Sequence, residues 1–161
     1  MKVKFSFALF VCFAILFSGC NKGEVYYRFK HIPQAKWSKD SVSNFTMDSI
    51  AVTTGKRYDI SIELTNNNQF PYQNLWLFIT QNLQDTNFTS DTLQIELADI
   101  YGKWHGSGSG GLYQLSIPYK TALPLYPDST YSIQIRQGMR DEPIRGIEKV
   151  GVKVKEAVSS E

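Results

Sequence analysis

The protein has 161 residues, of which 42% are hydrophobic, and its 17 basic residues slightly outnumber its 15 acidic ones. Lys2 and Lys4 account for that difference, so the rest of the chain is formally neutral and has no basic block of the kind that binds nucleic acid. The two cysteines, Cys12 and Cys20, both lie near the N-terminus, so no disulfide framework is expected and one domain must rest on its own core.

Residues 1–19 have the pattern of a secretory signal peptide. Lys2 and Lys4 precede an uncharged apolar run from Phe5 to Phe17, shorter than the roughly 20 residues that a membrane-spanning helix needs. The run leads into Leu16-Phe17-Ser18-Gly19-Cys20, which resembles the bacterial lipobox, although Phe17 stands where a smaller aliphatic residue is usual. We therefore expect cleavage before Cys20 and lipid on its thiol. The alternative is a secreted protein with a free thiol, a poor arrangement in an oxidising compartment.

Residues 20–23 are then the lipidated N-terminus and a short tether, and residues 24–161 the folded domain. Most of this domain shows the two-residue hydrophobic alternation of strands with one buried face, clearest in Tyr58–Leu64. No window carries a sustained helical stripe, and only Leu97–Ile100 has the pattern of a single helical turn. We predict an all-β fold, a single antiparallel β-sandwich of about eight short strands. The remaining expected strands are Val25–Phe29, Phe45–Ile50, Asn74–Thr80, Thr92–Leu97, Leu112–Tyr119, Thr130–Arg136 and Val150–Lys155.

The segment Leu75–Ile79 is apolar at every position. Such a run predicts a central strand that is covered on both faces, with Trp76 in the core. Trp76 as a partner contact is the less favoured interpretation.

Motifs for catalysis, metal binding and cofactor binding are weak. Gly106–Gly111 fits G-x-G-x-x-G, but the fingerprint requires a helix after it and a strand is expected from Leu112. The two histidines, His31 and His105, have no nearby cysteine or second histidine with which to form a zinc site. We expect no enzymatic activity, no cofactor and no metal.

Large aromatic and basic side chains beside turns are the better candidates for function. Tyr72 and Trp104 lie next to turn or glycine residues, where a ring can plug the core or contact a partner. The sequence leaves both interpretations open for Trp104. Met139 and Arg140 follow a strong strand in a possible functional loop, although Arg140 could instead neutralise neighbouring Asp141 or Glu142.

Four groups of residues stand out along the chain: Leu16–Cys20, Phe70–Leu77, Leu97–Asp99 with Gly102–Trp104, and Gln137–Arg140 with Gly146–Ile147. Together they resemble the gliding-motility lipoprotein GldH family, in the family's order and across the whole mature chain. The resemblance implies a non-enzymatic lipoprotein of the cell envelope, associated with the gliding apparatus and the linked type IX secretion machinery. Its partners would be the membrane, through the lipid, and other envelope proteins. Asn21, in place of a retaining aspartate, favours the outer membrane.

Four sequences are similar to the three-residue O-glycosylation motif of envelope proteins in the bacteria that carry this family: Asp40-Ser41-Val42, Asp48-Ser49-Ile50, Asp91-Thr92-Leu93 and Asp128-Ser129-Thr130. They make Ser41, Ser49, Thr92 and Ser129 candidate O-glycosylation sites. Aspartate followed by a hydroxyl residue is also ordinary turn chemistry, which is the alternative.

Two functional hypotheses follow. The first is an interaction module that supports gliding and secretion by binding envelope proteins, with Tyr72, Trp104, Met139 and Arg140 as candidate contacts. The alternative is a carbohydrate- or small-ligand-binding lipoprotein in which Trp104 and Tyr101 stack on sugar rings. Fold alone does not choose between them.

Overall fold

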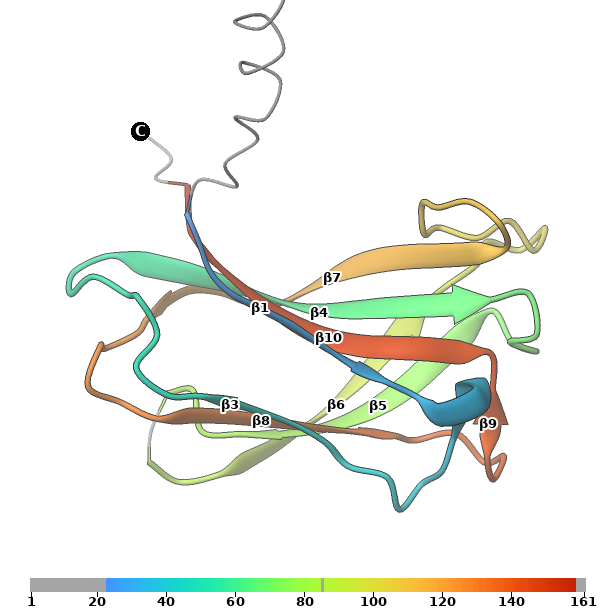
Figure 1. The fold of residues 1–161 in the computed structure, drawn as a ribbon, viewed down its shortest axis with the longest axis horizontal. Helices are drawn as coiled ribbons and strands as arrows, with labels where there is room; N and C mark the ends of the chain where they lie inside the picture. Colours follow the sequence, from blue (N-terminus) through green and yellow to red (C-terminus); the bar gives the residue numbers. More distant parts are fainter. Residues whose placement is uncertain (1–22, 85, 159–161) are drawn as a thin grey trace, which may run out of the picture.

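The computed structural model describes residues 23–84 and 86–158, which form two antiparallel sheets packed face to face (Figure 1). The strand order is β1-β10-β4-β7 in one sheet and β3-β8-β5-β6 in the other, and two short strands, β2 and β9, pair separately. The predicted all-β sandwich and its eight main strands are confirmed. The elements are β1 Glu24–His31, a 3₁₀ turn Pro33–Ala35, β2 Lys36–Trp37, β3 Ser43–Met47, β4 Arg57–Asn67, β5 Asn74–Gln81, β6 Thr89–Glu96, β7 Leu112–Pro124, β8 Tyr131–Gln137, β9 Ile144–Arg145 and β10 Ile147–Glu156.

The eight main strands form nested antiparallel pairs. β5 pairs with β6, β4 with β7, β3 with β8, and β1 with β10, so each pair encloses the one before it in the sequence. This nesting, with the pairs distributed over two sheets, is the topology of a double-sheet jelly roll. Hydrophobic alternation predicts the strands but carries no information about which strands pair.

The two ends of the sandwich carry different loops (Figure 1). At one end the chain enters and leaves, and the N–H of Glu156 donates to the carbonyl of Gly23 at 2.7 Å. We call it the terminal end; it also carries residues 48–56 and 125–130. We call the opposite end the distal end; it carries the loops at residues 68–73, 97–111 and 138–143.

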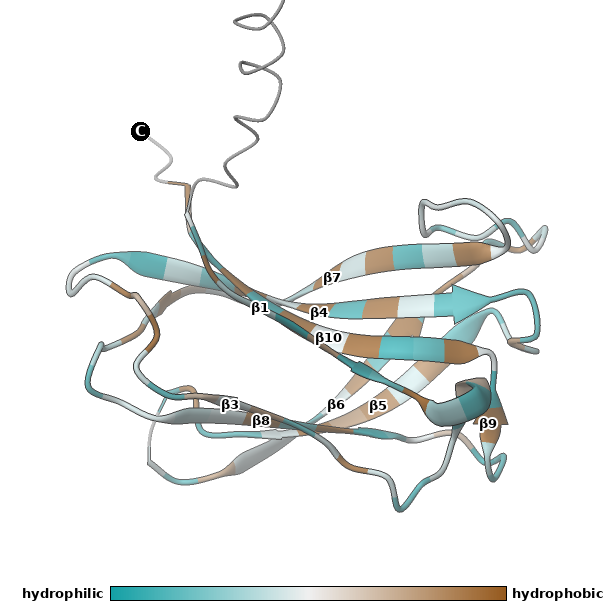
Figure 2. Ribbon diagram, viewed as in Figure 1, coloured by the Kyte–Doolittle hydropathy of each residue, from teal (hydrophilic) through white to brown (hydrophobic). Residues whose placement is uncertain are grey.

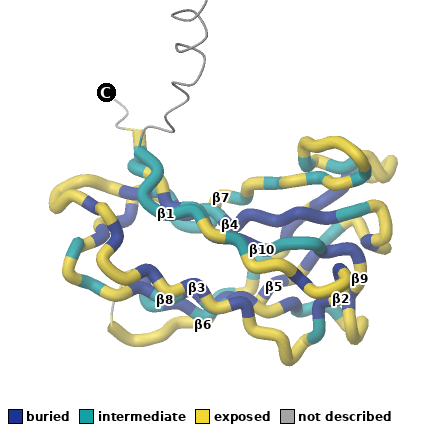
Figure 3. The backbone as a smooth tube through the Cα atoms, in the orientation of Figure 1, coloured by how far each residue is buried: buried dark blue, intermediate teal, exposed yellow. Residues whose placement is uncertain are grey.

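The core lies between the sheets and follows the two-residue period. Ile60 and Ile62 of β4 and Leu75 and Leu77 of β5 are fully buried. Hydrophobic residues alternate with polar ones along the strands (Figure 2), and buried residues lie mainly within the strands while exposed ones are common in the loops (Figure 3). Because each such side chain contributes about 1.5–3 kcal/mol when buried, this layer supplies the main drive to fold. Within the described ranges no helix is long and apolar enough to cross a bilayer.

The interpretation of β5 as covered on both faces is wrong. β5 is central in its sheet, with Leu75, Leu77 and Ile79 buried, but Trp76 is 38% exposed and Phe78 is 44% exposed. An all-apolar run has no period from which to tell a two-sided strand from one whose aromatic residues face outward. Trp76 is therefore a surface residue.

The single helical turn that Leu97–Ile100 could have formed is also absent. Leu97 and Ala98 are extended and buried, and a tight turn follows at Asp99–Gly102 in which the Gly102 N–H donates to the Asp99 carbonyl at 3.0 Å. Asp at the first position and Gly at the fourth position are typical of a type I turn, a signal that the sequence did contain.

Candidate functional site

The four predicted contact residues lie in the loops that form the distal end, and Figure 1 shows this end of the sandwich. Tyr72 precedes β5, Trp104 follows β6, and Met139 and Arg140 follow β8. The Tyr72 hydroxyl donates to Asp141 Oδ2 at 2.9 Å, which raises the pKa of Tyr72 and joins the β4–β5 loop to the β8–β9 loop. Residues that are scattered in sequence therefore share one surface.

Trp104 anchors this end and is not a free contact. Its ring lies 6.4 Å from Phe70 and 5.8 Å from Tyr113, measured between ring centroids. Its Nε1 donates to Asn68 Oδ1 at 3.2 Å, and its backbone forms a β-bridge with Ala98. This half-buried packing on two other rings favours an anchoring role for Trp104, and its role as a partner contact stays a prediction.

Met139 and Arg140 belong to a loop that is well supported by backbone contacts. Met139 Sδ accepts the Trp76 N–H at 3.4 Å, and Lys39 Nζ donates to the Arg140 carbonyl at 2.7 Å. The Lys39 N–H also donates to Glu142 Oε2 at 2.8 Å. A Ser38 hydrogen bond and then this N–H hold the pKa of Glu142 below its usual value. Arg140 itself is exposed.

The turn at Asp99–Gly102 presents two apolar side chains at the tip of this end. Ile100 is 76% exposed and Tyr101 is 89% exposed. Asp99 Oδ1 accepts the N–H groups of Lys103 and Tyr101, each at 2.9 Å, and these contacts lower the pKa of Asp99. Two exposed apolar residues are thus held on a pre-ordered turn. The sequence singles out Tyr101 as a ring beside a turn that could plug the core, contact a partner or stack on sugar, but it does not single out Ile100.

The glycine-rich segment after Trp104 closes as a hairpin. Ser107 and Gln114 exchange both backbone hydrogen bonds, at 3.0 and 2.9 Å. A Cβ on Gly108 would lie 2.0 Å from the Leu112 carbonyl oxygen, so glycine is needed here to let the two backbone segments approach each other closely. His105 is exposed, with Nε2 3.9 Å from Glu96 Oε1. No three His, Cys, Asp or Glu side chains among the residues described could hold a metal ion.

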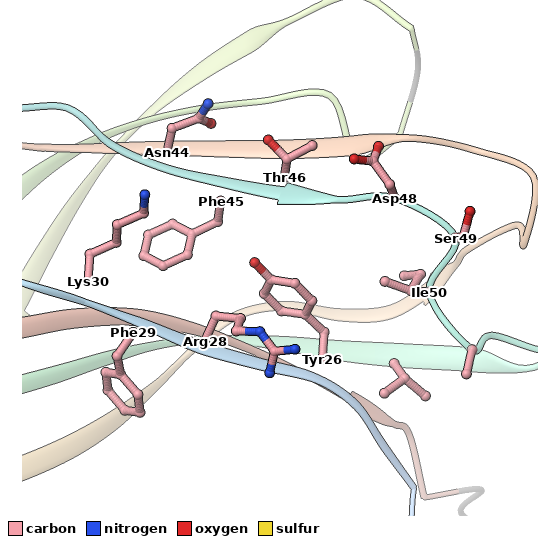
Figure 4. Close-up of a pocket in the computed structure, with 12 residues that line it drawn as sticks. Tyr26, Arg28, Phe29, Lys30, Asn44, Phe45, Thr46, Asp48, Ser49 and Ile50 are labelled. Atoms are coloured by element: carbon pink, nitrogen blue, oxygen red, sulfur yellow. The ribbon is translucent and has the colours of Figure 1, made fainter.

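A groove of about 820 Å³ opens on the side of the sandwich where β1 and β3 are the sheet edges. Tyr26, Arg28 and Lys30 of β1 line it together with Phe45 and Thr46 of β3 (Figure 4). Charged side chains that point inward from an edge strand hinder the addition of a further strand. We therefore interpret the groove mainly as a feature that keeps a further strand from pairing with the β1 edge.

The opposite side of the sandwich is closed by a contact between β6 and β7. The Tyr119 hydroxyl donates to Asp91, and Lys120 Nζ lies 2.9 Å from Asp91 Oδ2. The Tyr119 hydrogen bond and then the Lys120 ammonium lower the pKa of Asp91, while burial and then the Asp91 contact raise the pKa of Tyr119. The two sides of the molecule are therefore chemically distinct.

A family model described as GldH lipoprotein matches residues 24–154, from the start of β1 almost to the end of β10. The chain belongs to the GldH lipoprotein family. Two relatives match over nearly their full lengths. The gliding motility lipoprotein GldH homolog of Christiangramia forsetii is 32% identical over 98% of this chain and 99% of its own. The gliding motility lipoprotein GldH of Flavobacterium johnsoniae is 28% identical over 97% of this chain and 99% of its own.

Among solved structures, this GldH-family chain is similar to a carbohydrate-binding module specific for non-crystalline cellulose. The TM-score is 0.43 and the identity 10%, with 82% of this chain and 73% of that one covered. A likeness this distant carries no argument about fold or function.

The predicted modification sites of this GldH-family protein differ in their surroundings. Cys20 lies outside the described residues. Ser41, Ser49 and Thr92 are exposed, and Ser129 is half-buried in the β7–β8 loop. All four glycosylation sites stay predictions.

Proposed function

We propose that this protein is a lipid-anchored, non-enzymatic lipoprotein of the cell envelope that supports gliding motility by binding other envelope proteins through its distal end. Its membership of the GldH family and the names of its two relatives support the role in motility. The rigid turn that exposes Ile100 and Tyr101 supports the mode of action. The proposal extends to the outer membrane as location and to the type IX secretion machinery as the partner assembly.

The domain arrangement fits this function. Once a signal peptide at residues 1–19 is cleaved, lipid on Cys20 and a tether at residues 20–23 would hold the terminal end near the membrane, because β1 begins at Glu24. The distal end would then point away from the membrane, where partner proteins can reach it.

Lipid on Cys20 is the first part of this proposal to test. Two or more acyl chains anchor a protein stably, since each buried CH₂ contributes about 0.8 kcal/mol. We expect wild-type protein to sediment with membranes and to incorporate an alkyne analogue of palmitate, and Cys20→Ala to lose the label. A Cys20→Ala protein that keeps the label would place the lipid elsewhere.

The contact surface is tested by Tyr101→Ala. Because this ring is almost fully exposed on a pre-ordered turn, its loss should lower partner recovery severalfold while leaving the fold intact. The measurement is quantitative mass spectrometry after mild cross-linking and affinity purification from the native host. Recovery of gliding or secretion components with the wild type is the expected result.

The matched control is Tyr126→Ala, which removes a ring that is 53% exposed in the terminal-end loop at residues 125–130. It should recover partners at the wild-type level, and Arg140→Ala should behave like Tyr101→Ala. Equal loss in Tyr101→Ala and Tyr126→Ala would count against a specific distal surface.

A further inference from the structure

The two sheets present very different outer faces. We call β1-β10-β4-β7 the first sheet and β3-β8-β5-β6 the second sheet. On the first sheet, the Phe29 ring covers Gly151, where a Cβ would lie 2.6 Å from Phe29 Cδ1. Lys153 Nζ bonds Glu63 at 2.7 Å, and Glu63 is only 1% exposed. This face is therefore covered by its own side chains.

On the second sheet, the outer face keeps two aromatic rings open to solvent. Trp76 and Phe78 stand two positions apart on β5 and therefore point to the same side. Trp76 lies opposite Gln94 of β6, while Phe78 lies between Thr92 of β6 and Arg136 of β8. The rings form a short aromatic strip with polar side chains on both flanks.

The strip is held in place by the loop after β8. The Gly138 N–H donates to the Trp76 carbonyl at 2.7 Å, and the Trp76 N–H is directed at Met139 Sδ. Phe78 rests on Gly138, where an added Cβ would lie 3.1 Å from Phe78 Cε2. Because the rings sit on a central strand and one rests on a glycine, little ordering is needed when a ligand binds.

Two polar hollows adjoin the strip. One of about 570 Å³ is lined by Gln73, Asn74, Gln94 and Glu96, beside Trp76. The other, of about 370 Å³, lies beside Phe78. It is lined by Lys39, Asp40, Phe78, Arg136, Gln137, Gly138 and Met139. Side-chain amides and charged groups of these kinds both donate and accept hydrogen bonds next to the rings.

The apolar part of this surface is small and confined to the two rings. A fully exposed Trp or Phe offers on the order of 200 Å². The outward residues of β5, β6 and β8 carry one cation, Arg136, and one anion, Glu96. This face therefore has no concentration of positive or negative charge that would attract a strongly charged ligand.

We propose that this face binds a neutral oligosaccharide, with Trp76 and Phe78 as stacking platforms. A pyranose ring has an apolar face of C–H groups and a rim of hydroxyls, and it therefore matches aromatic rings flanked by amides such as Gln94. The site is separate from the distal turn at Ile100–Tyr101, so it adds to the proposed partner contact and does not depend on it.

The experiment uses the full lipidated chain, purified in detergent, on an array of neutral glucan, xylan and mannan oligosaccharides. We expect binding to at least one class, which calorimetry then quantifies. Trp76→Ala and Phe78→Ala should each weaken it at least tenfold. Tyr101→Ala should bind glycan normally while losing partners, so the two proposals can fail separately.

A second variant guards against indirect effects on the fold. Thr92→Arg keeps both rings but places a long side chain beside Phe78, and it should also abolish binding. Phe88→Ala, at a ring that is 54% exposed outside the strip, is the control and should change nothing. A folded wild-type protein that binds no neutral glycan, or binding that survives Trp76→Ala, would overturn the assignment.

Discussion

Gly146→Ala is expected to destabilise the protein by about 4 kcal/mol, one of the largest effects of any single methyl group in this fold. Gly146 has φ +87°, a conformation that costs an L-residue roughly 1–2 kcal/mol. A Cβ there would also lie 2.2 Å from the Phe70 nitrogen and 2.5 Å from its Cα, so the backbone would have to move. Overpacking of this kind adds typically 1–3 kcal/mol.

Urea denaturation followed by tryptophan fluorescence measures this loss. The matched control is Gly55→Ala, because Gly55 has φ +90° but no atom within 4 Å of the added Cβ. It should cost only about 1 kcal/mol, the strain alone. If both variants lost the same free energy of unfolding, the close approach of Gly146 to Phe70 would not be the cause.

The backbone conformation of Gly146 also affects the distal end. Its N–H donates to the Ala35 carbonyl, and its own carbonyl accepts the Asn67 N–H, both at 2.8 Å. It therefore fixes the end of β4 and the position of Phe70, on which Trp104 packs. Gly146→Ala protein that remains folded should accordingly show a disturbed distal end.

The strands could be predicted from sequence because their chemistry is local. Tyr58–Leu64 alternates buried and outward residues, and its period needs no knowledge of a partner strand. The pairing of β1 with β10 could not be predicted in this way, because Glu24 and Lys155 meet only after the whole chain has folded back.

The site shows the same division between local and long-range information. Tyr72 and Arg140 were found because aromatic and basic residues beside turns stand out in a sequence. The hydrogen bond from Tyr72 to Asp141, the chain neighbour of Arg140, and the packing of Trp104 on Phe70 depend on contacts between loops that are distant in the chain. Trp76 was misplaced because neighbouring apolar residues hid the direction of its ring.

Lys153→Met is expected to lower the free energy of unfolding by about 3 kcal/mol, because it leaves the buried Glu63 carboxylate without its cation. Glu63 lies on the outer face of β4 and is bonded by Lys153 Nζ at 2.7 Å and by Ser116 Oγ at 2.6 Å. Gln114 Nε2 approaches it at 3.3 Å. Without the ammonium the charge keeps only neutral donors, and breaking a buried pair from one side typically costs 3–5 kcal/mol.

Lys56→Met is the matched control, since Lys56 Nζ also lies 2.8 Å from a carboxylate, that of Glu156, but both side chains are largely exposed. Solvent screens an exposed pair, so its loss should hardly change stability, and chemical denaturation should separate the two variants clearly. The double variant Glu63→Leu/Lys153→Leu should regain most of the loss, because it removes both charges together. Equal stability of Lys153→Met and Lys56→Met would mean that water reaches Glu63. The covered face of the first sheet would then be as open as the Trp76 face, and the contrast that sets the second sheet apart as a binding surface would disappear.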